Sequence, residues 1–204
     1  MRSSHYSGVP FEIQAHRAND AATLRRLLAT RPSSVELDVG LGEDGLVVAH
    51  DHDLSDASRF TLDAALDISA GTHLVVEAKC APPDTASPRA FARALGPYLR
   101  EVTVCSFEER VLNEVRRRSS ARTTFLFDRP MPIATVADTL GPHYDLVTSE
   151  LIRVAHRVGL RVVPWTVNDV RHMAELISLG VDGFVTDEPA LAREVAADRG
   201  QLAA

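Results

Sequence analysis

Two histidines in this chain have the same flanking residues, and only one of them is expected to take part in chemistry. The tripeptide Ala-His-Arg occurs at His16, in FEIQAHRAND, and again at His156, in LIRVAHRVGL. His16 ends an extended apolar run just before a helical segment, whereas His156 lies inside a helical pattern. We therefore predict that His16 is a functional residue at a strand end and that His156 lies on the flank of a helix.

Charged side chains spaced two residues apart occur in the next two extended runs. Glu36 and Asp38 in SVELDV point to the same face of a strand, because side chains alternate along an extended chain. In LVVEAK the same spacing separates Glu77 from Lys79. Carboxylates that converge in a protein interior repel one another, and a hard divalent cation relieves both the repulsion and the burial of charge. The sequence therefore predicts that Glu36, Asp38 and Glu77 bind one cation, Mg²⁺ or Ca²⁺.

Positive side chains beside these carboxylates indicate an anionic substrate. Arg17 follows His16, and Lys79 shares a face with Glu77. A metal ion combined with Lys and Arg is the set of groups best suited to a phosphoryl group. A Schiff-base role for Lys79 is disfavoured, since neighbouring carboxylates hold its amine protonated.

Two further residues at predicted strand ends have open interpretations. Trp165, the only tryptophan, is expected either to pack in the core or to form one wall of a substrate pocket. Asp187, in VTDEP, is expected to cap the last helix, because Asp is a preferred residue at helix N-termini.

A second candidate histidine, His50, follows a predicted hairpin in GLGEDGLVVAHD. With a three-residue loop at Glu43-Asp44-Gly45, Asp38 and His50 lie opposite each other and share a face. A two-residue turn at Asp44-Gly45 shifts the register by one and turns His50 away. We favour the longer loop, in which His16 and His50 flank a phosphate as general acid and general base, with the order of their roles open.

Eight extended segments alternate with helical segments along the whole chain. This order predicts parallel strands with crossover helices, and eight such units close a compact (β/α)8 TIM barrel, here with a hairpin after strand 2. The expected strands are residues 11–16, 34–39, 74–79, 102–107, 123–127, 145–149, 161–167 and 182–187. The expected helices are residues 20–31, 61–69, 88–99, 108–119, 133–141, 149–159, 169–180 and 188–200. The rival architecture, a doubly wound open sheet, lacks its Gly-rich phosphate loop in this sequence.

The composition limits the classes of partner. The chain has 204 residues, 45% of them hydrophobic and 25% charged, and we expect one domain over residues 1–204. A net charge of −6 argues against a nucleic-acid surface. No apolar run suits a signal peptide or a membrane span, so we expect no integral membrane association. Cys80 and Cys105 are expected to be buried free thiols, which is typical of a cytoplasmic protein.

The ordered set of motifs resembles the glycerophosphodiester phosphodiesterase family, which belongs with the phosphatidylinositol phospholipase C-like barrels. The match extends from about residue 11 to about residue 195. The matching pieces are His16-Arg17, Glu36-Leu37-Asp38-Val39, Glu43-Asp44-Gly45, Val48-Ala49-His50-Asp51, Glu77-Ala78-Lys79, Trp165-Thr166-Val167-Asn168 and Gly183-Phe184-Val185-Thr186-Asp187.

The resemblance implies a role for each of these groups. It implies a metal site made by the three carboxylates, acid–base catalysis by the two histidines, and a phosphate held by Arg17 and Lys79. The implied reaction is the hydrolysis of a small glycerophosphodiester-like molecule to an alcohol and a phosphomonoester, in lipid metabolism. Two alternatives stay open: a lyase on the same barrel that leaves a cyclic phosphate, and a non-catalytic phospholipid-binding descendant.

Two departures from the family pattern border the expected site of the alcohol. The family has Gly after His-Arg, where this chain has Ala18. The family also inserts a small helical subdomain after the His-Asp motif, but here the next helix is expected near Thr61. The phosphodiester chemistry is expected to persist with a more open mouth, which would admit an alcohol other than glycerol.

Overall fold

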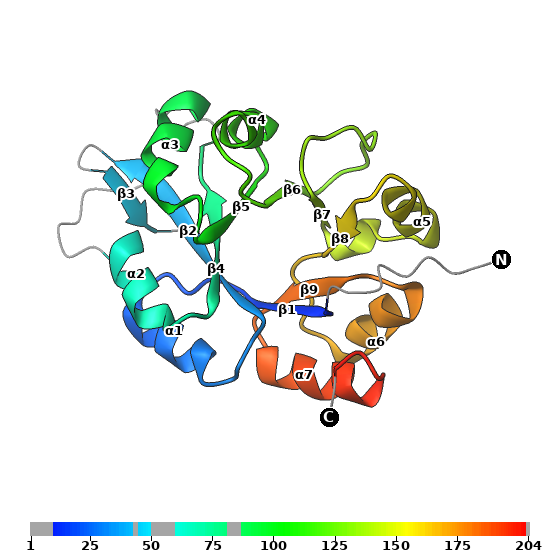
Figure 1. The fold of residues 1–204 in the computed structure, drawn as a ribbon. Helices are drawn as coiled ribbons and strands as arrows, with labels where there is room; N and C mark the ends of the chain where they lie inside the picture. Colours follow the sequence, from blue (N-terminus) through cyan, green and yellow to red (C-terminus); the bar gives the residue numbers. More distant parts are fainter. Residues whose placement is uncertain (1–9, 43–44, 50–59, 81–86, 203–204) are drawn as a thin grey trace.

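Parallel strands alternate with helices around a nearly closed barrel in the computed structural model, which describes residues 10–42, 45–49, 60–80 and 87–202 (Figure 1). The strands are β1 (Glu12–Ala15), β2 (Ser34–Gly42), β3 (Gly45–Val48), β4 (His73–Ala78), β5 (Val102–Ser106), β6 (Thr123–Phe127), β7 (Thr139–Pro142), β8 (Arg161–Val162) and β9 (Gly183–Thr186). The α-helices are α1 (Ala21–Leu28), α2 (Leu62–Ser69), α3 (Pro88–Ala94), α4 (Glu109–Arg118), α5 (Ser149–Arg157), α6 (Val170–Leu179) and α7 (Pro189–Asp198). Two 3₁₀ turns, η1 (Gly96–Tyr98) and η2 (Tyr144–Leu146), complete the described elements.

Eight of the strands run parallel in the order β8-β7-β6-β5-β4-β2-β1-β9, and β3 adds to β2 in the antiparallel sense. Backbone hydrogen bonds join the two ends of this order. The N–H of Val167 donates to Val185 O at 2.8 Å, and the N–H of Val185 donates to Pro164 O at 2.8 Å. The predicted (β/α)8 TIM barrel is therefore confirmed.

The local sequence explains where the helices begin and which face they bury. In α4 the apolar residues Val111, Leu112 and Val115 are buried. The arginines at its C-terminal end interact favourably with the negative end of the helix dipole. Six α-helices begin after a side chain that accepts a hydrogen bond from a backbone N–H of the first turn. These capping residues are Asp20, Thr61, Ser87, Glu108, Thr148 and Asp169.

The sixth βα unit differs from the sequence prediction. The predicted helix at 133–141 and the predicted strand at 145–149 are wrong. The strand of this unit is β7, which begins at Thr139, and residues 128–138 before it contain no helix. A β-carbon placed on Gly141 would lie 2.6 Å from Leu126 Cδ2, so the glycine allows β7 to pack closely on β6. The predicted helix at 88–99 is also interrupted, since α3 gives way to η1 at Gly96-Pro97 and proline lacks a backbone donor.

The predicted register of the hairpin is wrong as well. Gly42 pairs with Gly45 and Val39 with Val48, so two residues rather than three separate the paired glycines. The φ of Gly45 is +126°, which glycine adopts without a steric penalty. The N–H of Ala49 donates to Asp38 O at 3.0 Å, which places Ala49 opposite Asp38. His50 itself lies outside the described residues.

Candidate active site

A cavity of about 170 Å³ opens where the strands of the barrel end, at their C-terminal side. Its lining comes from residues in, or just beyond, β1, β2, β4, β5, β6, β8 and β9, at the side of the barrel where catalytic groups lie. Most of the residues predicted from the sequence line this cavity. They are His16, Arg17, Glu36, Glu77, Lys79 and Trp165.

The three predicted carboxylates converge at this end of the barrel. Glu36 and Asp38 share a face of β2 and are 3% and 1% exposed. β4 lies beside β2 in a register that pairs Asp38 with Glu77. One oxygen from each of the three side chains lies within 4.8 Å of the other two. Three carboxylate oxygens at this separation can act together as ligands of one hard divalent cation.

Glu36 Oε1 is an oxygen of this cluster that has no hydrogen-bond donor among the described residues. Glu36 Oε2 accepts a hydrogen bond from the backbone N–H of Arg17 at 2.9 Å, whereas the buried Glu36 Oε1 accepts none from the described residues. Burial raises the pKa of Glu36 well above its ordinary value, and the charges of Asp38 and Glu77 raise it further. A buried carboxylate oxygen without a donor is unfavourable, so the residues present fit a bound cation.

Lys79 supplies the positive charge nearest to the carboxylates. Its Nζ lies 2.7 Å from Asp38 Oδ1 and 2.5 Å from Glu77 Oε1. Burial alone would lower the pKa of Lys79, but Glu77 and Asp38 outweigh burial and raise it. The amine therefore stays protonated at neutral pH. A protonated amine suits the binding of an anion, whereas a Schiff-base nucleophile must be neutral.

The segment after β1 supports Asp38 in a way that the sequence did not indicate. Asn19 Nδ2 donates to Asp38 Oδ2 at 2.7 Å, and the N–H of Asp38 donates to Asn19 Oδ1 at 2.9 Å. Arg17 has a φ of 55°, in the left-handed region, and its Nε lies 3.6 Å from Asp38 Oδ2. This turn therefore directs both a backbone donor and a guanidinium at the acidic cluster.

His16 is held by a carboxylate from the other end of the chain. Its Nδ1 lies 2.7 Å from Asp187 Oδ1, and Asn168 Nδ2 donates to Asp187 Oδ2 at 2.6 Å. Burial alone would raise the pKa of Asp187, but the hydrogen bonds with His16 and Asn168 outweigh it and lower the pKa. An ionised Asp187 favours the proton on Nδ1, which leaves Nε2 of His16 as a proton acceptor.

The pKa of His16 is nevertheless lowered, because burial disfavours the imidazolium more than Asp187 stabilises it. The imidazole is therefore neutral at pH 7. The predicted capping role of Asp187 is wrong: the N-cap of α7 is Glu188, whose side chain makes no capping hydrogen bond. Asp187 faces His16 instead.

The opposite wall of the cavity is aromatic. Trp165 packs on the small cluster of Val75, Cys105 and Leu126 and also lines the cavity. Its Nε1 donates to Gly141 O at 2.7 Å. The ring of Phe107, which is 42% exposed, meets Trp165 edge-on with centroids 5.3 Å apart. The cavity thus combines one charged side with one apolar side.

A sequence model of the "Glycerophosphoryl diester phosphodiesterase family" matches residues 89–191, which is half of the chain. The chain belongs to this family. The matched residues include Trp165 and Asp187 but begin after Lys79. The acidic cluster lies outside them, so its identification depends on the geometry of the three carboxylates.

Curated relatives align over short segments. Glycerophosphodiester phosphodiesterase GDPD4 of Arabidopsis thaliana is 38% identical over 55 residues, which are 27% of this chain and 17% of that protein. A glycerophosphodiester phosphodiesterase of Caldanaerobacter subterraneus subsp. tengcongensis is 36% identical over 59 residues, 29% of this chain and 24% of that protein. The chain therefore matches less than a quarter of the length of either relative.

Solved structures resemble the whole barrel. A glycerophosphodiester phosphodiesterase from Parabacteroides distasonis has a TM-score of 0.79 and 22% identity, covering 95% of this chain and 100% of that chain. An Oleispira antarctica phosphodiesterase, in complex with the product sn-glycerol-3-phosphate, has a TM-score of 0.81 and 18% identity, covering 94% and 98%. At these identities the likeness establishes the shared fold. Among the described helices, none combines the length and apolar character needed to cross a membrane.

Proposed function

We propose that this member of the family is a divalent-metal-dependent phosphodiesterase that cleaves a small glycerophosphodiester-like substrate to an alcohol and a phosphomonoester. The observation that carries the proposal is the convergence of three carboxylates, Lys79 and His16 on one cavity. The product bound by the Oleispira antarctica phosphodiesterase is a phosphomonoester of the class proposed here.

The acidic cluster would hold the cation, Mg²⁺ or Ca²⁺, through Glu36, Asp38 and Glu77. A bound ion of this kind polarises phosphoryl oxygens and offsets their charge. Lys79 and Arg17 are the groups of this chain assigned to the phosphate, because an ammonium and a guanidinium both donate to phosphate oxygens. The aromatic wall of Phe107 and Trp165 is assigned to the alcohol part of the substrate.

His16 is assigned to proton transfer. Its neutral imidazole, and an Nε2 with no hydrogen bond to the residues that the structure describes, suit the acceptance of a proton near pH 7. His50 is assigned the complementary role of proton donor from the resemblance to the family alone, since the sequence left the order of the two roles open and Ala49, rather than His50, lies opposite Asp38. The two histidines would then act on the attacking and leaving oxygens of one phosphodiester.

Phosphorus NMR of the reaction products tests this function. With Mg²⁺ or Ca²⁺ present, a panel of glycerophosphodiesters is expected to give a phosphomonoester signal and one free alcohol, and the protein without metal is the control. A cyclic phosphate that persists would show that the protein catalyses the lyase reaction rather than hydrolysis. Failure to cleave any diester in the panel with either metal would contradict the proposal.

Asp187→Asn is expected to lower kcat/KM at pH 7 by about 10²-fold or more, because the imidazole loses its orienting carboxylate. Asp187 raises the pKa of His16 against the effect of burial. Removing that charge lowers the pKa further, so the acid limb of the pH profile of kcat/KM should move to lower pH. Glu188→Gln, at the neighbouring position, should leave the profile unchanged. An unshifted acid limb in Asp187→Asn would contradict the positioning role.

A further inference from the structure

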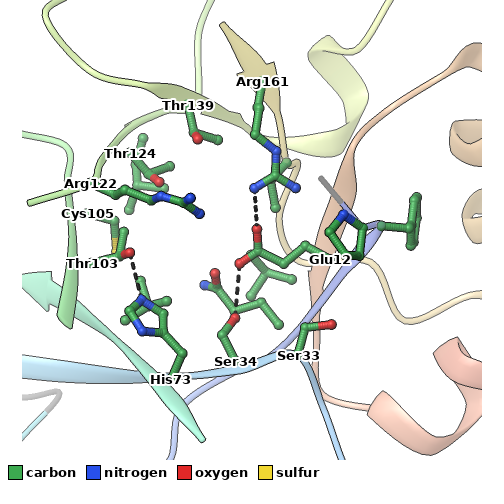
Figure 2. Close-up of a pocket in the computed structure, with 17 residues that line it drawn as sticks. Glu12, Ser33, Ser34, His73, Thr103, Cys105, Arg122, Thr124, Thr139 and Arg161 are labelled. Carbon is green, nitrogen blue, oxygen red and sulfur yellow. Dashed lines mark hydrogen bonds and ion pairs between the residues drawn. The ribbon is translucent and has the colours of Figure 1, made fainter. Parts of the chain in front are cut away.

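A second cavity, of about 240 Å³, lies at the opposite end of the barrel, where the strands begin (Figure 2). Glu12, Ser34, His73, Thr139 and Arg161 are the first residues of β1, β2, β4, β7 and β8, and all five line it. Hydroxyl, guanidinium and imidazole groups face one space in Figure 2, and apolar side chains form much of the remaining lining. This cavity is therefore separate from the candidate active site.

Glu12, the carboxylate labelled in this cavity, forms an ion pair with Arg161 (Figure 2). Glu12 Oε2 lies 2.7 Å from Arg161 Nη1, and Ser34 Oγ donates to Glu12 Oε1 at 3.0 Å. Arg161 Nη2 also donates to the backbone O of Asp182 at 3.0 Å. Each carboxylate oxygen of Glu12 therefore has a partner, and the ion pair of Glu12 with Arg161 carries no net charge.

Arg122 differs from Arg161 in having no such partner. It directly precedes β6, and its side chain extends into the cavity (Figure 2). Across the described ranges, no hydrogen bond or ion pair engages its guanidinium, which carries five N–H donors. The hydroxyls of Thr103 and Thr124 line the same space. The cavity therefore has an excess of positive charge and of hydrogen-bond donors.

His73 responds to this charge. Its Nε2 lies 2.8 Å from Thr103 Oγ1. Burial lowers the pKa of His73, and Arg122 lowers it further, against the opposing effect of Glu12. The imidazole is therefore neutral at pH 7, and the positive charge of the cavity comes from Arg122.

A shallower groove of about 590 Å³ continues from the cavity and shares His73, Thr103 and Arg122 with it. Its other lining residues include Arg100, Arg118, Ser119 and Ser120, and no acidic side chain of the described chain lines it. Arg118 is held by Glu114. In a protein with a net charge of −6, this is a local concentration of arginines and hydroxyls.

We propose that the cavity at the N-terminal end of the barrel binds a small phosphate-bearing anion, with Arg122 as its principal ligand. The planar guanidinium matches two phosphate oxygens, and the Thr124 hydroxyl can donate to a third, as can that of Thr103 in the tautomer where His73 Nε2 is the donor. The groove beside Arg122 leaves room for the organic part of a phosphomonoester. This site is independent of the proposed phosphodiesterase reaction.

Because the active-site cavity also carries phosphate-binding groups, the test must tell the two ends of the barrel apart. Gln14, Cys105, Leu126 and Val185 line both cavities, so only one layer of side chains separates them. NMR chemical shifts of the backbone amides distinguish the two ends of the barrel. The sample is the ¹⁵N-labelled full chain, from which metal has been removed on a chelating resin. Thr103 and Thr124 report on the proposed site, and Lys79 reports on the active site.

Inorganic phosphate is expected to shift the amides of Thr103 and Thr124 in a saturable manner. Arg122→Gln should weaken this binding by about tenfold or more, because it removes a charge-assisted pair of hydrogen bonds. Arg25→Gln, which removes an exposed arginine on α1, should bind phosphate as the unchanged protein does. Lys79→Met should keep the shifts at Thr103 and Thr124.

The proposal would be overturned by shifts confined to the active-site end, by shifts that do not saturate, or by equal phosphate binding in Arg122→Gln. Titration with glycerol phosphate separates a phosphomonoester site from a site for free phosphate. The phosphomonoester should bind at least as tightly, since the groove accommodates its organic part. Acetate that bound as tightly as phosphate would show a general anion site and would overturn the assignment to phosphate.

Discussion

Replacing His16 with alanine is expected to lower kcat/KM for phosphodiester cleavage by about 10²- to 10⁴-fold, the usual contribution of a general acid or base. The imidazole borders the cavity, its Nδ1 is engaged by Asp187, and its pKa is lowered so that the free nitrogen can accept a proton. The measurement is steady-state kinetics at saturating metal, with thermal unfolding to verify that the variant remains folded.

His156→Ala is the matched control for this experiment. His156 has the same two neighbours in sequence and also faces an aspartate, with Nε2 2.8 Å from Asp182 Oδ2. It lies on α5, however, and does not line the active-site cavity. We expect near-normal turnover and a loss of about 1 kcal/mol in the free energy of unfolding from the lost hydrogen bond. Equal losses of activity in the two variants would contradict the role of His16.

Glu36→Gln is expected to abolish turnover without destabilising the metal-free protein. The amide oxygen can still accept the hydrogen bond from Arg17, but the ligand charge is lost. In the absence of metal, Glu36 is buried and is repelled by Asp38 and Glu77, so removing its charge should leave the Tm unchanged or raise it. Loss of activity together with unchanged or increased stability is the result expected of a metal ligand.

Thermal unfolding with and without Mg²⁺ or Ca²⁺ provides the second measurement. A cation that binds the folded state alone raises its Tm, so the unchanged protein should gain stability and Glu36→Gln should not. Chelation should remove turnover, and added cation should restore it. Glu150→Gln, at the exposed start of α5, serves as the charge control. Full activity in excess chelator, or an equal gain in Tm for Glu36→Gln, would contradict the metal site.

The barrel could be predicted from the sequence because seven of its units combine an apolar strand with a helix that buries apolar residues, and six of these helices have a side-chain cap. In the sixth unit, residues 133–138 follow two prolines and only Ala137 among them is buried, so their apparent helical pattern was incidental. The adjacent strand, Thr139–Pro142, is short and contains Gly and Pro, both uncommon in strand interiors. Its place depends on close packing against Leu126, which local sequence does not reveal.

The acidic cluster could be predicted because strand alternation alone puts Glu36 and Asp38 on one face, and parallel pairing brings Glu77 beside them. The partner of His16 could not, since Asp187 lies 171 residues away and its position before a helix fits a cap equally well. Asn19 was missed for a related reason, because an Asn near a helix start is ordinary in sequence. The hairpin register depended on which residues around Gly45 form the turn, and both alternatives considered were off by one or more residues.

The absence of a helix between β6 and β7 makes the mouth of the barrel asymmetric. The half that carries the carboxylates is built on β2 and β4, the latter deeply embedded between two parallel neighbours. The aromatic half adjoins residues 128–138, a stretch in which most side chains are solvated and few backbone groups are paired. Local unfolding should require less free energy there than around the carboxylates. In the proposed function, such a division would join a stiff half that fixes the phosphorus centre to a compliant half that adjusts to alcohols of different size.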